Sequence, residues 1–232
     1  MRMCVFGDIH GNLPALQAAL PKILAEKCTT NVFLGDACGY YSEAQAVIET
    51  LMQIPDLVAV RGNHDDLFIG ALNGDKMIRK EYAAKYGPAL ETFLEQGDPA
   101  VVAWLKALPV TQTLLHEKVF CCHGSPRDPL NEYVYPDTPM QDHAVLPHDW
   151  FFLGHTHYAM DRKVNAMRFV NPGALGQPRD GFWPRYAVVD TDRKSVRFCE
   201  VRFDRESFVK KIRDWAPEHP YLADVWERIG HL

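Results

Sequence analysis

The sequence lacks long apolar runs, an excess of basic charge and paired cysteines. No stretch approaches the roughly 18 apolar residues that a membrane-spanning helix needs, and the apolar run at the N-terminus is too short for a signal peptide. The formal net charge of -5 argues against a protein that grips nucleic acid through a basic surface. We therefore expect a cytoplasmic protein without membrane association, and nucleic acid is not its expected partner.

The cysteines give no sign of a covalent framework. They form no C-x-x-C pair and follow no regular spacing, so buried, reduced thiols are the favoured interpretation of Cys4, Cys28, Cys38, Cys121, Cys122 and Cys199. With 232 residues, of which 47% are hydrophobic, the chain can bury a sizeable core without disulfide bonds or a structural metal ion. We expect residues 1–232 to form a single domain.

Apolar runs and helical periodicity alternate in the first part of the chain. Residues 3–6, 31–34 and 57–60 are short apolar runs that predict buried strands. Between them, residues 13–26 and 42–52 show the apolar spacing of helices. This β-α-β-α-β order with short connections is typical of an α/β sheet with parallel strands.

Helical composition dominates the next interval, and strands follow it. Residues 66–109 are expected to form a helical insert that could cap a site. The strand-like runs after it are 110–115, 118–122, 150–153, 159–163, 167–170, 185–189 and 195–202. Two helices close the chain, and the last is expected to dock on the body through a stripe made of Tyr221, Leu222, Val225, Trp226 and Ile229.

Asp, Asn and His residues fall directly after the predicted strands. They are Asp8, His10, Asp36, Asn63, His64, His123, His155 and His157. In open α/β sheets, ligand sites gather at the C-terminal ends of strands. Residues two apart in an extended segment point the same way, so Asp8 with His10, and His155 with His157, can each converge on one site.

The donor types in this group indicate a metal site. Carboxylate, amide and imidazole groups without thiolate suit manganese, iron, zinc or magnesium, and they disfavour a structural zinc knot. Any single motif of this kind is weak evidence for a metal site, because Gly-Asp after a strand often only forms a turn. Five such elements in this order are hard to explain as independent accidents.

Together these motifs resemble the calcineurin-like metallophosphoesterase superfamily. The resemblance runs from Asp8 to about Asp190, and it rests on Gly7-Asp8-Ile9-His10-Gly11-Asn12, Gly35-Asp36, Gly62-Asn63-His64-Asp65, His123-Gly124 and Gly154-His155-Thr156-His157. Two further segments, 123–130 and 171–180, resemble the small bacterial and archaeal phosphodiesterase branch of the superfamily.

The resemblance implies a fold and a division of roles. The implied fold is α/β, with two packed mixed β-sheets flanked by helices (a four-layer αββα sandwich) and the helical insert at 66–109. One metal ion would be held by Asp8, His10 and His157. The other would be held by Asn63, His123 and His155. Asp36 would bridge both ions, and His64 would be catalytic.

The implied cofactors are two divalent ions, with manganese favoured over iron, zinc, nickel or magnesium. A hydroxide that bridges the two ions would attack phosphorus in line. His64, oriented by Asp36 or Asp65, would protonate the leaving oxygen or stabilise its charge.

Three further residues are candidates for contact with the substrate. Asn12 could touch the phosphate, although capping of the first helix is the favoured role for it. Arg127 and Arg179 are also candidates, because a guanidinium group can bind a phosphate with two hydrogen bonds. For both arginines, substrate contact and an ion pair that fixes a loop are equally favoured.

The leading functional hypothesis is a phosphodiesterase or phosphatase acting on a small phosphorylated molecule, such as a nucleotide or a dinucleoside polyphosphate. A phosphoprotein phosphatase and a non-catalytic metal-binding scaffold are the alternatives. A metal-dependent hydrolase of other esters or amides is a third, less favoured reading. The complete set of ligands and the retained His64 argue against the scaffold. The sequence gives no oligomeric state.

Overall fold

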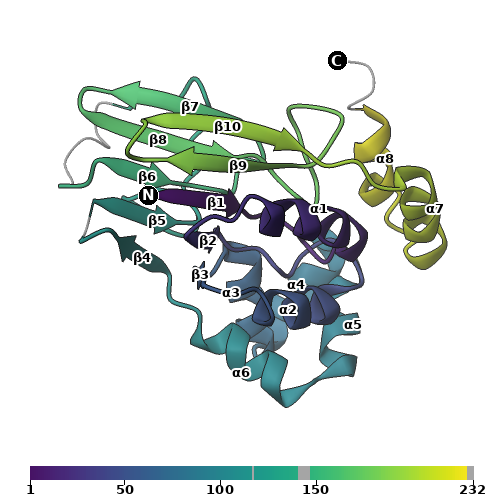
Figure 1. Cartoon of the computed structure of the whole chain (residues 1–232). Helices are drawn as coiled ribbons and strands as arrows, with labels where there is room; N and C mark the ends of the chain where they lie inside the picture. Colours follow the sequence, from purple (N-terminus) through teal and green to yellow (C-terminus); the bar gives the residue numbers. More distant parts are fainter. Residues whose placement is uncertain (117, 141–146, 229–232) are drawn as a thin grey trace.

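Two five-stranded mixed sheets packed face to face form the centre of the computed structural model, which describes residues 1–116, 118–140 and 147–228 (Figure 1). The first sheet has the order β10-β9-β1-β2-β3, with β1 Arg2–Phe6, β2 Thr30–Phe33, β3 Leu57–Ala59, β9 Arg185–Asp190 and β10 Ser195–Glu200. Strands β1, β2 and β3 are parallel, and β9 runs antiparallel to both β1 and β10.

The second sheet has the order β4-β5-β6-β8-β7. Its strands are β4 Thr111–Leu114, β5 Val119–Cys122, β6 Trp150–Phe152, β7 Ala159–Val164 and β8 Met167–Pro172. Strands β5, β6 and β8 are parallel, while β4 and β7 pair antiparallel at the two edges. The expected α/β fold of two mixed sheets flanked by helices is thus confirmed.

Alternation along the strands builds two apolar layers. Met3 and Val5 of β1 point between the sheets, where they join residues of β5, β6 and β8. Cys4 and Phe6 point outward and pack under helices α1 (Leu13–Ala25) and α2 (Ala44–Met52). Because both faces of β1 are buried, the strand appears in the sequence as an uninterrupted apolar run. The outer face of the second sheet packs against Val134 and Met140.

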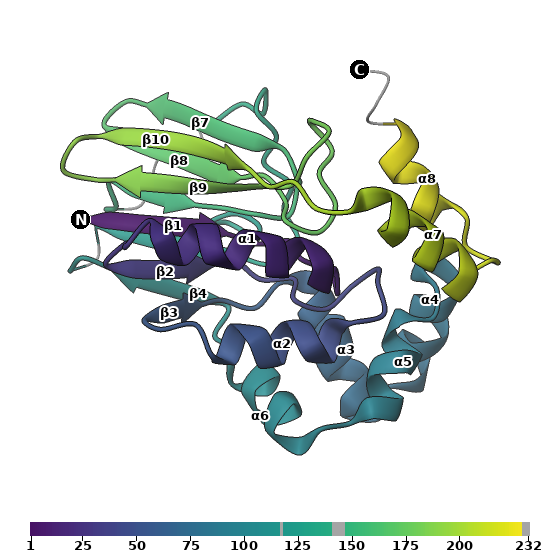
Figure 2. The same cartoon turned by 45° about the vertical axis from the view of Figure 1, so that its right-hand side comes forward.

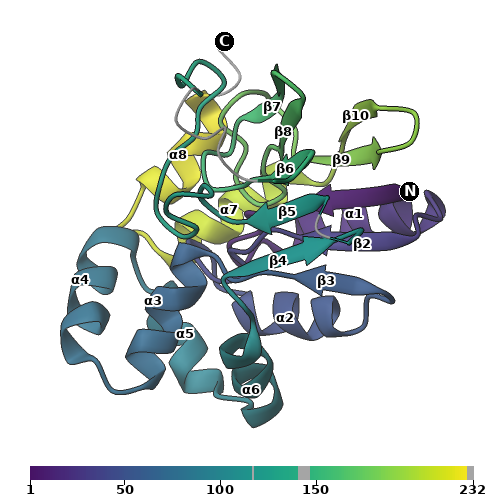
Figure 3. The same cartoon turned by 90° about the vertical axis from the view of Figure 1, so that its left-hand side faces the viewer.

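Four helices separate the two sheets along the chain, and they lie together beside α2 (Figures 2 and 3). They are α3 Asn63–Leu72, α4 Lys76–Tyr86, α5 Ala89–Gln96 and α6 Pro99–Ala107. Helix α3 begins at Asn63, three residues before the helical interval expected at 66–109. The Asp65 carboxylate accepts from the Gly62 N–H at 3.0 Å and starts the helix there.

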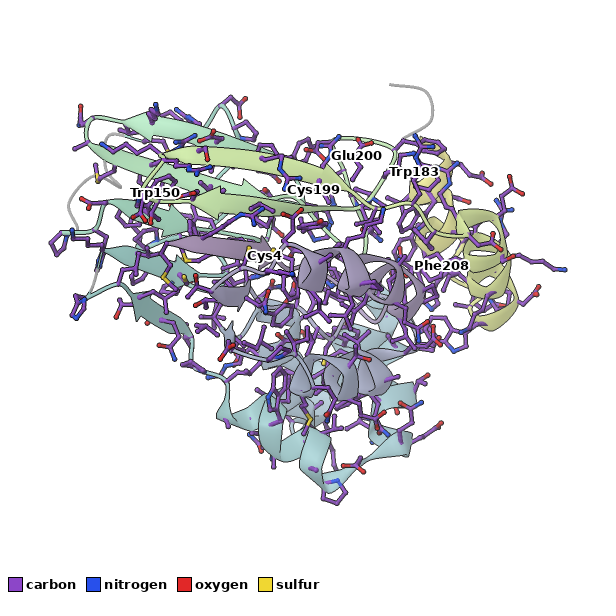
Figure 4. All side chains as sticks on the ribbon, viewed as in Figure 1. Cys4, Trp150, Trp183, Cys199, Glu200 and Phe208 are labelled. Atoms are coloured by element: carbon purple, nitrogen blue, oxygen red, sulfur yellow. The ribbon has the colours of Figure 1, made fainter. Side chains whose placement is uncertain are left out.

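The C-terminal helices α7 (Arg205–Trp215) and α8 (Tyr221–Arg228) pack at one end of the molecule, where Figure 4 shows Phe208. As predicted, α8 docks through its apolar stripe: Leu222 and Trp226 are buried, whereas Ile229 lies outside the described residues. The Trp226 indole N–H donates to the Tyr41 hydroxyl at 2.8 Å. No helix in the described ranges is long and apolar enough to cross a membrane.

Replacing Trp226 by alanine should destabilise the protein by about 3–5 kcal/mol, because a large buried side chain and its hydrogen bond to Tyr41 are lost. Trp226→Phe keeps most of the ring and should cost only about 1–2 kcal/mol. Urea unfolding of both variants measures the difference. Equal, small losses in both would show that α8 is not docked as described.

Candidate metal centre

The eight polar side chains that follow the predicted strands come together at one edge of the two sheets. All are buried except Asn63, which is partly exposed. Three sets of donor atoms each lie within 4.8 Å of one another: Asp8, His10 and His157; Asp36, His123 and His155; and His10, Asp36 and His64. The structure therefore brings all the predicted ligand residues into one cluster.

The first set is centred on two imidazole nitrogens. Nε2 of His10 lies 3.0 Å from Nε2 of His157. The Asp8 Oδ1 atom lies 3.4 Å from the His157 nitrogen and 3.9 Å from that of His10. Asp8 Oδ2 is buried and has no hydrogen-bond partner among the described residues. A buried carboxylate oxygen without a donor is in a position that a cation can satisfy.

The second set lies beside the first, and Asp36 of the second set approaches His10 of the first. Nε2 of His123 lies 3.0 Å from Asn63 Oδ1 and 3.2 Å from Asp36 Oδ2. The same Asp36 oxygen lies 3.6 Å from the His10 Nε2 atom. One carboxylate thus stands between two groups of donors.

Main-chain carbonyls determine which nitrogen each histidine presents. Nδ1 of His10 donates to the Cys38 carbonyl at 3.1 Å, and Nδ1 of His157 donates to that of Gln177 at 2.6 Å. Because a carbonyl oxygen can only accept, each ring keeps its proton on Nδ1 and presents a lone pair from Nε2.

The other two histidines follow the same rule. Nδ1 of His123 donates to the Leu34 carbonyl at 2.8 Å, and Nε2 of His155 donates to that of Asn131 at 3.2 Å. In metalloproteins, such outer hydrogen bonds orient imidazole ligands. Four imidazole lone pairs facing two carboxylates form a donor set that fits divalent metal ions.

Burial and neighbouring charges shift the protonation of the cluster. Burial lowers the pKa of His155 to about 3, and it holds the pKa values of His10 and His157 well below the usual range. Burial also raises the pKa of Asp8 to about 7. For His123, burial is outweighed by the Asp36 and Asp8 charges, which raise its pKa to about 9. His10, His155 and His157 are thus in the neutral form that binds metal, whereas His123 must lose a proton when it binds an ion.

The backbone at this edge is strained in the same places that carry the donors. Five donor residues adopt positive φ angles: Asp8 52°, His10 53°, Asp36 59°, His155 67° and His157 63°. Such angles are uncommon outside glycine and cluster at functional sites. The side-chain pairs converge because of these turns. The spacing of these residues predicted extended segments, and that prediction is wrong: the side chains meet because the backbone turns at each of them.

A buried carboxylate holds one of these turns in place. Asp65 accepts from the main-chain N–H groups of Asp36 and Cys38 at 2.8 and 2.9 Å, and also from that of Gly62. A Cβ at Gly62 would overlap the Asp36 carboxylate, so this position requires glycine. The role of Asp65 is thus to fix the loop that carries Asp36.

His64 is held by a residue that the sequence did not indicate. Its Nδ1 atom lies 2.9 Å from the Tyr82 hydroxyl on α4, so the expected orientation of the ring by Asp36 or Asp65 is wrong. Asp36 instead accepts from the His64 main-chain N–H at 2.9 Å. The Tyr40 and Tyr86 rings flank the imidazole at 4.9 and 4.8 Å. The helical segment therefore reaches the site.

The three candidate substrate residues occupy different positions. Asn12 caps α1: its Oδ1 accepts from the Ala15 N–H at 3.1 Å and its Nδ2 donates to the Gly176 carbonyl at 2.9 Å. Capping is therefore its observed role. Arg127 lies 3.8 Å from Glu132 and is more than half exposed, which is the geometry of a loop ion pair.

Arg179 lies near the cluster. Its guanidinium is 3.3 Å from the Tyr40 hydroxyl. Burial is the main cause of the raised pKa of Asp8 and of the lowered pKa values of His10 and His64; the Arg179 charge opposes the first shift and adds to the other two. Tyr133 was not predicted; its half-exposed ring stacks on His155 at 3.8 Å. Arg179 was a candidate from the sequence, whereas nothing in the sequence places Tyr133 beside the strand ends.

Known proteins are similar to this chain over most of its length. Residues 1–194 match the family model described as the calcineurin-like phosphoesterase superfamily domain. An uncharacterized protein of Methanocaldococcus jannaschii, MJ0912, is 27% identical over 237 residues, which cover 93% of this chain and 94% of that protein.

A curated relative of named activity is the phosphodiesterase YfcE of Escherichia coli, 25% identical over 206 residues, which cover 84% of this chain and 91% of that one. It agrees with the resemblance to the small bacterial and archaeal branch. The crystal structure of a metallophosphoesterase from Sphaerobacter thermophilus superposes with a TM-score of 0.81 at 25% identity, covering 98% and 99% of the two chains. The chain belongs to the calcineurin-like phosphoesterase superfamily.

Proposed function

We propose that the protein hydrolyses a small phosphate ester with the help of two divalent metal ions. The observation that carries this proposal is the set of four histidines, each of which gives its N–H to a carbonyl and its lone pair to the cluster. Asp8, His10 and His157 would hold one ion, and Asn63, His123 and His155 the other. Asp36, within 3.6 Å of donors from both groups, would bridge them.

Manganese is the ion that we favour, with iron, zinc, nickel and magnesium as alternatives, because the donors are oxygen and imidazole nitrogen. When bound, such a pair lowers the pKa of a water and neutralises charge on the phosphate. Asn63 contributes a neutral oxygen, which limits the negative charge of a site that must admit an anion.

The protein groups around the cluster have separate tasks in this reaction. Arg179 supplies a positive charge to the phosphate, since its guanidinium lies beside the Tyr40 hydroxyl and its charge acts on Asp8 of the cluster. His64 stabilises or protonates the leaving oxygen. The exposed face of Tyr133, which is 48% accessible, offers an apolar surface for the organic part of the ester.

Several observations favour a small phosphodiester or phosphomonoester over the alternatives. The curated relative YfcE is a phosphodiesterase. The Tyr82 and Tyr86 rings of α4 pack on His64, so we expect the helical segment to limit the approach of a protein substrate. Every ligand residue and His64 are present in the cluster, which argues against a non-catalytic scaffold.

Removing the metal should abolish turnover. Protein stripped by a chelator and reloaded with manganese is assayed against phosphomonoesters, cyclic nucleotides and dinucleoside polyphosphates, while elemental analysis follows the bound metal. Activity should fall to background on stripping and return as the content approaches two ions per chain, because the ions activate the water. Turnover that survives in fully metal-free protein would refute the proposal.

His64→Ala should lower kcat by about 100- to 10,000-fold, the usual contribution of general acid–base catalysis. Both metal ions should stay bound, because His64 is assigned no ligand role. His116→Ala is the matched control: that histidine is exposed in the turn between β4 and β5 and should behave as wild type. Loss of one ion from the His64 variant would make His64 a ligand and remove its catalytic assignment.

A further inference from the structure

The Tyr82 hydroxyl is buried against His64 with a single partner. Its oxygen lies 2.9 Å from the His64 Nδ1 atom, and Tyr82 is 2% exposed. Within the described ranges it has no other hydrogen-bond partner. A buried hydroxyl that fails to donate costs about 1–3 kcal/mol, so this proton is directed to Nδ1.

That hydrogen bond fixes the tautomer of His64. A ring nitrogen that accepts a proton from a hydroxyl carries a lone pair, so a neutral His64 keeps its own hydrogen on Nε2. This is the reverse of His10, His123 and His157, whose Nδ1 atoms donate to carbonyls and whose Nε2 atoms bear lone pairs. His64 therefore differs from the ligand histidines in what it can present: a donor instead of an acceptor.

Aromatic packing leaves the ring little freedom. The Tyr82 ring meets His64 edge to face at 5.7 Å and 89°. Tyr82 itself packs on Phe68 of α3 at 5.3 Å. The end of α4 is braced in turn by α8, because the Tyr221 hydroxyl donates to the Lys85 carbonyl at 2.8 Å. The hydroxyl thus belongs to a rigid helical segment.

We propose that Tyr82 is a positioning residue, which holds His64 in the Nε2–H tautomer and directs that N–H toward the leaving oxygen of the substrate. The inference rests on the proposed function. Tyr82 does not touch the substrate, so it acts only through His64. Its contribution therefore depends on how much the leaving oxygen needs a hydrogen-bond donor as the bond to phosphorus breaks.

The test uses Tyr82→Phe, which keeps the ring and removes the hydroxyl, and aryl phosphate esters of graded leaving-group pKa. We expect kcat to fall by about 10-fold for the poor leaving group phenol, the factor for one lost buried hydrogen bond, and by less than about 3-fold for p-nitrophenol. KM and the metal content should stay near the wild-type values. Tyr186→Phe is the matched control, because it removes the hydroxyl of a buried tyrosine on β9, beside Cys199 of β10. Its kcat should stay at the wild-type value for both leaving groups.

A double-mutant cycle separates positioning from general destabilisation. In the His64→Ala background, Tyr82→Phe should change kcat by less than about 2-fold, because the residue through which it acts is gone. An additive loss in that background, an equal loss with every leaving group, or a loss of metal from Tyr82→Phe would each overturn the proposal.

A spectroscopic readout keeps the proposal testable even if no substrate is turned over. Nitrogen-15 NMR of the magnesium-loaded protein reports which His64 nitrogen is protonated. The wild type should show a protonated Nε2 and a bare Nδ1, and Tyr82→Phe should show a mixture of tautomers. A protonated Nδ1 in the wild type would overturn the assignment, whereas inactivity with the expected tautomer would count against the proposed function alone.

Discussion

Four buried imidazoles each donate one ring N–H to a main-chain carbonyl, and the chemistry of the site depends on these bonds. Each bond makes the histidine a directed acceptor when its ring is neutral, so that His10, His123 and His157 can then present a lone pair toward Asp8 and Asp36. Lone pairs and carboxylates packed this closely repel one another in a buried environment. Two cations bound between these groups would remove the repulsion, because each lone pair and carboxylate oxygen could then coordinate a positive ion.

The fold supplies the carbonyls and the turns that these bonds require. Leu34 lies at the end of β2 and Gln177 in the loop after β8, so residues from both sheets orient the ligands. The strained turns that carry the ligands are held by buried polar groups such as Asp65. The helical segment contributes Tyr82, whose hydroxyl donates to His64, whereas the other four histidines donate to carbonyls. One histidine of the cluster is thereby distinguished from the other four.

The strands and the clustering of the polar residues that follow them could be predicted from the sequence, because buried parallel strands are apolar runs and their ends carry the polar residues. The packing of α8 was predictable from the helical spacing of its apolar residues, which places them on one face of the helix. The contacts of His64 were not predictable. Tyr82 is 18 residues away on another helix, and its meeting with His64 depends on how α3 and α4 pack. Nor does spacing reveal the left-handed turns at Asp8 and His10, since the same spacing also fits an extended strand.

In the proposed site Asp36 would join two metal ions, and magnetic coupling between the ions tests this most directly. Electron paramagnetic resonance of the protein loaded with two equivalents of manganese should show an exchange-coupled pair, because a bridging carboxylate holds the ions within about 4 Å of each other. Asp36→Ala, which removes the bridge, should show only isolated ions or lose them. Isolated ions in the wild-type protein at the same loading would contradict the account.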